Sequence, residues 1–213
     1  MTSTSRPGAP VATRAVGRGD TVRAAVDARV EALRAVAHPG VLVPAAVIRG
    51  EGDQVAVRVP WIDGVDLAEL ESRRGPLSAG ECVWLGTRIA GALEAMHAQG
   101  LAHGDVAPGN VLIVDGGVML VDTVAGCLTD EHGTVGFRAP ERESGASAAA
   151  DVYSLGALLR WCVADLDRIA IEAWTAPLVA RDAASRPPVS VAATALQSCA
   201  RAAPVAVPRS EDV

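Results

Sequence analysis

Apolar residues follow a helical period in two long stretches of the chain. Over residues 21–37 they recur three and four positions apart, at Val22, Val26, Val30 and Leu33. A longer stretch with the same spacing covers residues 78–100. In it, Ser78 and Glu81 have the spacing of a capping box, and Gly100 favours termination. Both stretches are therefore predicted to be helices that bury one face.

Shorter apolar runs, typical of strands, occur in two pairs. Residues 41–50 and 55–60 are rich in Val and flank a polar turn, Glu-Gly-Asp-Gln. Residues 111–114 and 118–122 are joined by Asp-Gly-Gly, a sequence that favours a tight hairpin. Each pair is predicted to form two antiparallel strands.

The order of these elements predicts an α+β chain with two unequal lobes. Further helices are expected over 150–163 and near 167–180 and 188–201. The small lobe, with one helix and strands, is assigned to residues 19–62, and the larger, mainly helical lobe to residues 63–202. Residues 1–18 and 203–213 show no apolar period and are rich in small residues, Pro and Arg, so they are predicted to be disordered.

Composition limits the class of protein. Half of the residues are hydrophobic and the net charge is -6, which fits a globular chain and argues against general nucleic-acid binding. No run reaches the roughly 18 apolar residues of a membrane span. The first residues lack the apolar core of a signal peptide, and the four cysteines lack metal-ligand spacing. We therefore expect a cytoplasmic protein with no membrane segment and no nucleic-acid partner.

Three polar residues border the second predicted hairpin. Asp105 and Asn110 precede it and Asp122 ends it, so the hairpin is expected to bring them to one side. Two carboxylates and an amide oxygen are hard ligands that suit Mg²⁺, and an Asp in such a loop is suited to accept a hydroxyl proton. The residues alone leave an alternative, in which these side chains only form a loop and end a strand.

The motifs around this hairpin resemble those of protein kinases, in the family's order. They are the catalytic loop His-Gly-Asp-Val-Ala-Pro-Gly-Asn (103–110), Val-Asp-Thr-Val (121–124) in place of Asp-Phe-Gly, the end of an activation segment (133–141) and the start of the following helix (151–156). The similarity, which is to bacterial Ser/Thr protein kinases, extends over roughly residues 20–200.

This resemblance implies roles for four residues around the nucleotide. Asp105 is implied as the catalytic base, while Asn110 and Asp122 would hold Mg²⁺. Asp66, after the segment that links the lobes, would face the ribose of ATP. ATP and Mg²⁺ are therefore candidate cofactors.

Four further residues have implied structural roles. His103 would brace the catalytic loop, and Asp151 would accept hydrogen bonds from backbone N–H groups of that loop. Glu141 would form a buried ion pair with Arg186 and so tie the activation segment to the helical lobe.

The phosphate side of the pattern departs from the family. All 19 basic residues are arginines, so the strand lysine that holds the phosphates is absent. Ala107 replaces a second lysine, and Arg29 stands near the position of the helix glutamate that pairs with the first. Val124 replaces the glycine of Asp-Phe-Gly, and Gly104 replaces the arginine of His-Arg-Asp.

The glycine-rich lid is also reduced. Gly17 and Gly19 are the candidates for its remnant, and the lysine-bearing strand is expected to be missing because a helix begins almost at once. If phosphate is bound, the expected substitute cations are Arg23, Arg29 and Arg58. An arginine is a poor replacement where a compact, mobile ammonium was used.

We therefore predict a pseudokinase, which acts in regulation or signalling by binding a nucleotide, an unidentified protein or both. The alternative is a weakly active, ATP-dependent Ser/Thr protein kinase with substitute phosphate-binding residues. Two further readings stay open, a small-molecule phosphotransferase with a similar loop and a scaffold with an inactive pocket. The sequence leaves open whether another chain completes the small lobe.

Overall fold

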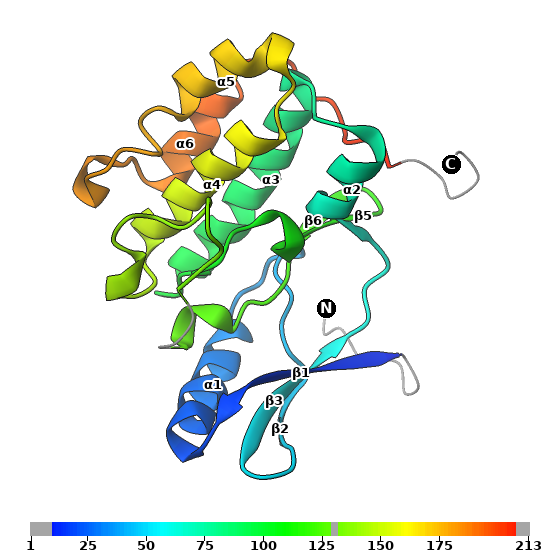
Figure 1. The fold of residues 1–213 in the computed structure, drawn as a ribbon, viewed down its shortest axis with the longest axis vertical. Helices are drawn as coiled ribbons and strands as arrows, with labels where there is room; N and C mark the ends of the chain where they lie inside the picture. Colours follow the sequence, from blue (N-terminus) through cyan, green and yellow to red (C-terminus); the bar gives the residue numbers. More distant parts are fainter. Residues whose placement is uncertain (1–9, 129–131, 208–213) are drawn as a thin grey trace.

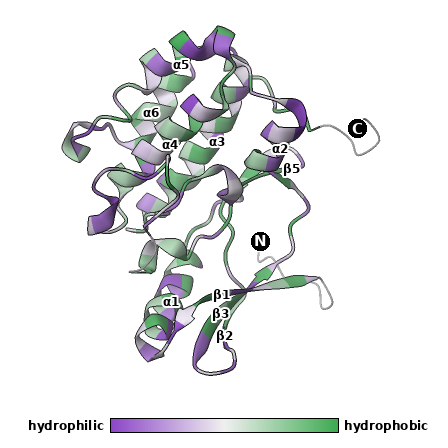
Figure 2. Cartoon of the chain, viewed as in Figure 1, coloured by the Kyte–Doolittle hydropathy of each residue, from purple (hydrophilic) through white to green (hydrophobic). Residues whose placement is uncertain are grey.

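A three-stranded antiparallel sheet and one helix form a small lobe at one end of the molecule (Figure 1). The computed structural model describes residues 10–128 and 132–207. The sheet has the order β1–β3–β2, and its elements are β1 (Val11–Arg18), α1 (Asp20–Leu33), β2 (Ala46–Arg49) and β3 (Gln54–Pro60). Strand β3 is mainly hydrophobic and the β2–β3 turn is hydrophilic (Figure 2), because the strand faces the core and the turn faces water.

Strand β1 corrects two predictions. Residues 11–18 are not a disordered lead-in, and a strand does precede the first helix. The strand forms because its backbone pairs with β3 from Val11 opposite Pro60 to Arg18 opposite Gln54. Residues 1–9 of the predicted lead-in lie outside the described residues.

The two glycines expected as a lid remnant lie at the end of β1 instead. Gly17 is at an irregularity in the pairing of β1 with β3, with φ 151°, and Gly19 precedes α1 with φ 88°. Only glycine adopts such angles without strain. Their role is therefore the turn from strand to helix.

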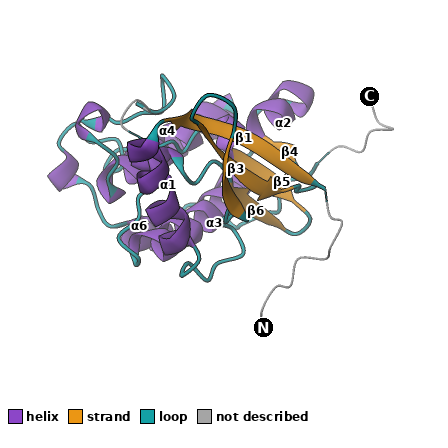
Figure 3. Ribbon diagram, turned by 90° about the horizontal axis from the view of Figure 1, so that it is seen from below, coloured by secondary structure: helices purple, strands orange, loops and turns teal. Residues whose placement is uncertain are grey.

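The large lobe contains a second three-stranded sheet and five α-helices among the described residues. The sheet has the order β4–β5–β6. The elements are β4 (Val65–Asp66), α2 (Leu67–Arg74), α3 (Ala79–His97), β5 (Val111–Val114), β6 (Gly117–Leu120), α4 (Ala148–Cys162), α5 (Arg168–Thr175) and α6 (Val189–Leu196). Short 3₁₀ turns lie at Pro108–Asn110, Ala125–Cys127, Arg142–Ser144, Asp165–Asp167 and Ala183–Ser185. From below, the strands of both sheets gather to one side of α1, α3 and α6 (Figure 3).

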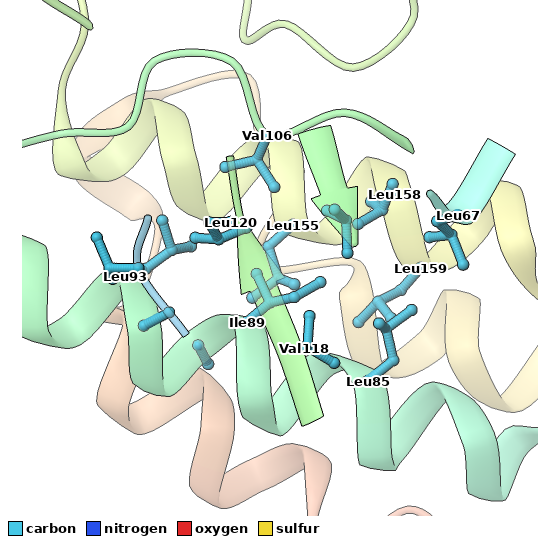
Figure 4. Packing of buried hydrophobic residues seen from close by; sticks show 14 of the residues in the cluster. Leu67, Leu85, Ile89, Leu93, Val106, Val118, Leu120, Leu155, Leu158 and Leu159 are labelled. Carbon is cyan, nitrogen blue, oxygen red and sulfur yellow. The ribbon is translucent and has the colours of Figure 1, made fainter. Parts of the chain in front are cut away.

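Aliphatic side chains from α3, α4 and β6 form the centre of the large lobe (Figure 4). They include Leu85, Ile89, Leu93, Leu120, Leu155, Leu158 and Leu159, all fully buried. Burial of each such side chain stabilises the fold by about 1.5–3 kcal/mol. Gly86 lets α3 and α6 approach closely, since a Cβ there would lie 2.5 Å from Leu196. This core provides the rigid base on which the β5–β6 hairpin and its preceding loop are held.

The predicted tail is ordered over residues 203–207. The backbone N–H of Ala203 donates to the carbonyl of Gly80 at 3.0 Å, and Val205 is 7% exposed. Disorder is therefore wrong for this part, because backbone pairing and an apolar contact fix it. Residues 208–213 lie outside the described residues. Of the described helices, none is both long and apolar enough to cross a membrane.

The predicted capping box at the start of α3 is confirmed. The Ser78 side chain accepts from the Glu81 N–H, and Glu81 accepts from the Ser78 N–H at 3.0 Å. Glu81 also forms an ion pair with Arg74 at 2.5 Å. Burial favours the neutral acid, but the hydrogen bonds from Arg74 and Ser78 outweigh it and lower the pKa of Glu81 from 4.5 to about 2.

Replacing Glu81 with Gln is expected to lower the free energy of unfolding at pH 7 by about 2 kcal/mol, after allowance for solvent screening. A carboxylate whose pKa is lowered by folding stabilises the fold at pH values above its pKa in the unfolded chain. This contribution is lost as the pH falls towards 2. The difference in free energy of unfolding between the wild-type protein and Glu81→Gln, measured by urea unfolding, should therefore narrow from pH 5 to pH 2.5. Glu69→Gln, which alters an exposed pair with Arg73, serves as the control. A gap that does not vary with pH would contradict this account.

Candidate functional site

A cavity of about 360 Å³ lies between the two lobes. Ala12 of β1 and Val57 of β3 line it from the small lobe, and Leu112 of β5 lines it from the large lobe. Most of its surface is apolar, and its charged lining residues are Arg14, Asp66, Glu69 and Asp122. The cavity can therefore accept a flat apolar group with charged groups at its edges.

A second cavity of about 410 Å³ adjoins the first, since Arg14 and Asp122 line both. Asp105, Asn110 and Thr134 line this second cavity as well. The three polar residues expected at the hairpin therefore do lie around one space. They are joined there by an arginine that the sequence interpretation did not include.

Asp105 has both carboxylate oxygens in hydrogen bonds. Its Oδ1 accepts from the backbone N–H of Thr134 at 2.7 Å and from the Thr134 hydroxyl at 2.8 Å. Its Oδ2 accepts from the side-chain nitrogen of Asn110 at 2.7 Å. The carboxylate is thus fixed in one position beside the Thr134 hydroxyl.

Asp122 has a left-handed backbone, with φ 57°. Few residues other than glycine adopt this conformation, and a surrounding structure that maintains it is common at functional sites. The carboxylate is 4% exposed and lies 2.5 Å from the guanidinium of Arg14. The backbone after β6 is therefore shaped to present this carboxylate to the cavity and to Arg14.

Arg14 is absent from the predicted site because the sequence predicts residues 1–18 to be disordered, whereas the structure places Arg14 on β1. A weak signal was present, since Val-Ala-Thr-Arg at 11–14 matches the first two residues of Val-Ala-Ile-Lys and has Thr in place of Ile and Arg in place of Lys. Of the arginines expected as substitutes, Arg23 pairs with Asp27, and Arg58 is exposed on β3 opposite Thr13. Neither they nor Arg29 are among the described residues that line the two cavities.

Arg29 connects α1 to the large lobe. It is 7% exposed, and it donates to the carbonyl of Thr123 at 3.0 Å and to that of Ala102 at 2.5 Å. Burial lowers its pKa, although Cys127 and Asp151 oppose this. The residue predicted to stand near the position of the family's helix glutamate is thus an arginine that binds two backbone carbonyls.

His103 and Asp151 fix the loop before Asp105. Asp151 accepts from the backbone N–H groups of His103 at 2.7 Å and Gly104 at 2.8 Å, and pairs with His97 at 2.8 Å. The ring of His103 is buried. Its Nε2 lies 2.9 Å from the carbonyl oxygen of Val121, and its Nδ1 accepts a hydrogen bond from the backbone N–H of Asp105. Its Nε2 is therefore the protonated nitrogen, and burial lowers the pKa of His103.

Glu141 and Arg186 form a bidentate pair with N–O distances of 2.6 and 2.9 Å. The Arg186 side chain is fully buried and also donates to the carbonyls of Ala149 and Ala180. Its hydrogen bonds lower the pKa of Glu141. The pair joins the segment before α4 to the segment before α6.

Three other predicted positions have local explanations. Asp66 lines the first cavity, but its carboxylate caps α2 by accepting from the Glu69 N–H at 2.8 Å. Val124 has a right-handed backbone, with φ -91°, a conformation that does not require the glycine found in the family's Asp-Phe-Gly motif. Beside Gly104, the guanidinium of Arg142 donates to the Gly104 carbonyl at 2.8 Å and fills the space of the missing arginine.

The donors do not fit Mg²⁺ while Arg14 holds Asp122. One oxygen of that carboxylate is in the ion pair with Arg14. In the described part of the chain, no group of three or more His, Cys, Asp or Glu side chains is arranged to hold a metal ion. Mg²⁺ requires near-octahedral oxygen ligands, and here a guanidinium takes part of that space.

Comparison with known proteins agrees with this fold. The protein kinase domain model matches residues 14–166. The chain belongs to the protein kinase family, as its motifs predicted, and the predicted α+β fold with a small lobe is confirmed.

The chain is similar to bacterial Ser/Thr protein kinases. It is 41% identical over 127 residues to serine/threonine-protein kinase PknE of Mycobacterium tuberculosis (strain ATCC 25618 / H37Rv), covering 54% of this chain and 22% of that protein. It is 39% identical over 137 residues to PknK of Mycobacterium bovis, covering 59% of this chain and 12% of that protein. The chain therefore spans less than a quarter of the length of these relatives.

Proposed function

We propose that this chain is a protein kinase-like regulatory module that binds a nucleotide, a protein partner or both, and transfers phosphate inefficiently. The observation that carries the proposal is the scarcity of basic side chains around the two cavities, where the phosphates of a nucleotide would need them. Arg14 is the one basic residue among the described residues that line the two cavities, and it is paired with Asp122.

Phosphoryl transfer depends mainly on positioning and on neutralisation of charge. Ala107 stands where the family has a second lysine and is 3% exposed, so it supplies no charge near Asp105. Loss of one preorganised donor typically slows a reaction roughly 10²- to 10³-fold. Arg14 is a planar, less compact substitute for the other lysine. Rapid turnover is therefore not expected.

A second function, weak Ser/Thr protein kinase activity, is favoured by one observation. Asp105 is held between Asn110 and the Thr134 hydroxyl, next to the cavity that Arg14 and Asp122 line. This arrangement retains a base for a protein hydroxyl and one cation for phosphate. It supports slow transfer to protein substrates.

Nucleotide binding and transfer can be measured together. Millimolar ATP, at about ten times its Kd, should stabilise the protein by about 1.4 kcal/mol and raise Tm by roughly 3–6 °C. Ala12→Phe, which fills the first cavity, should abolish the shift. Transfer of labelled phosphate to a protein acceptor should be at most about 1% of that of an active relative.

The outcomes separate the two functions. Transfer at the rate of an active relative that is lost in Asp105→Ala would replace the pseudokinase proposal with the kinase. Absence of a Tm shift in the wild-type protein would exclude nucleotide binding and leave protein binding as the proposed function. An equal shift in Ala12→Phe would place the nucleotide elsewhere.

A further inference from the structure

Arg14 reaches from a half-exposed strand to a buried carboxylate. Its side chain is 48% exposed, whereas that of Asp122 is 4% exposed. The backbone of Arg14 is fixed because it lies opposite Val57, a buried residue of β3. The guanidinium therefore meets Asp122 on one side while much of its surface remains open to both cavities.

The charges around the two cavities explain why a cation is needed there. The acidic lining residues are Asp66, Glu69, Asp105 and Asp122, and Arg14 is the basic one among the described lining residues. A nucleoside triphosphate brings further negative charge to the same space. Unless a cation lies between them, the phosphates and the carboxylates repel one another.

In this chain the carboxylate of Asp122 is neutralised by a side chain of the protein itself, the guanidinium of Arg14. A guanidinium has five N–H donors in a planar fork, so one edge can hold a carboxylate while other N–H groups hold a phosphate. A metal ion at Asp122 would have to displace Arg14 from a buried oxygen or lie beside another positive charge. The first would break the charge-assisted hydrogen bond between Arg14 and Asp122, and the second would place two positive charges close together, where they repel.

We infer that Arg14 takes the place of Mg²⁺ at Asp122, so that the chain binds nucleoside triphosphates without a divalent metal. The inference rests on the proposed nucleotide-binding function. In it, the Arg14 guanidinium bridges the Asp122 carboxylate and the phosphates. Asp122 then acts to orient Arg14 and does not bind the ligand through a metal.

The test is the affinity of a fluorescent ATP analogue in 10 mM MgCl₂, roughly a cellular excess, and in excess EDTA. The wild-type Kd should be the same within about twofold under both conditions. Arg14→Ala should weaken binding in EDTA about ten- to a hundredfold, since charge-assisted hydrogen bonds are lost. Mg²⁺ should restore part of that affinity, because Asp122 is then accessible to the metal.

Two more variants distinguish a specific bridge by Arg14 between Asp122 and the phosphates from a general effect of positive charge. Asp122→Asn removes the carboxylate that orients Arg14, so it should weaken metal-free binding, but by less than Arg14→Ala does, because the guanidinium that contacts the phosphates remains; metal-mediated binding would instead be lost. Arg58→Ala removes an exposed arginine of the same sheet that does not line either cavity, and it should match the wild-type protein. Circular dichroism of each variant shows whether it is folded.

Two results would overturn the inference in different ways. Wild-type binding that weakens more than about tenfold in EDTA would show that a metal is required, and would leave the proposed nucleotide binding intact. Absence of binding with and without Mg²⁺ would overturn the inference and the nucleotide part of the proposed function together.

Discussion

Replacement of Arg29 by Glu is expected to lower the free energy of unfolding by about 3–5 kcal/mol. The substitution installs the residue that kinases carry on this helix. In this chain, however, the new carboxylate would be buried facing the carbonyls of Thr123 and Ala102, which would both lose their donor. Three acceptors would then share a buried site that has lost its guanidinium.

Urea unfolding of the purified variant measures this loss. Arg34→Ala is a matched control on the same chain segment, because Arg34 and its partner Glu31 are both exposed and such pairs contribute at most about 1 kcal/mol. Arg29→Lys should be intermediate, since an ammonium can reach one carbonyl. A loss below about 1 kcal/mol in Arg29→Glu would show that Arg29 does not hold the two lobes together.

Replacement of Glu141 by Ala should cost about 3 kcal/mol of stability, because it leaves the fully buried Arg186 guanidinium without its carboxylate. The hydrogen bonds of Arg186 to Ala149 and Ala180 remain, so the loss lies at the lower end for a broken buried pair. Denaturant unfolding is the measurement. Glu143→Ala changes an exposed residue nearby and should be nearly neutral.

The same pair predicts a pH dependence. Because Arg186 lowers the pKa of Glu141, the pair stabilises the fold above the unfolded carboxyl pKa and loses that contribution on acidification. The difference between the wild-type protein and Glu141→Ala should therefore shrink at acid pH. A Glu141→Ala variant as stable as the wild type at pH 7 would refute the structural role given to this pair.

Local patterns predicted the parts of the fold that are local in origin. The helix at 78–100 and the hairpin after Asn110 have their caps, turns and apolar periods within a few residues. The hairpin also brings Asp105 and Asn110 near Asp122, because the three are joined by one short connection. These features need no knowledge of distant contacts.

The parts that were missed depend on distant contacts. Strand β1 is mostly exposed and shows no clean alternation, and it exists because it pairs with residues of β3 that lie 36 to 49 positions later in the chain. The same strand carries Arg14, so an error in one element concealed a residue of the site. Arg29 likewise has partners 73 and 94 residues away, which no local pattern could indicate.

The hydrogen bonds of Arg29 have a consequence for motion of the two lobes. Separation of α1 from the large lobe would break two charge-assisted hydrogen bonds at once, a cost of about 3 kcal/mol or more. An open arrangement would then make up less than about 1% of the molecules at equilibrium. Hinge opening is thus a rare event, so a ligand meets the two lobes mainly in their closed arrangement.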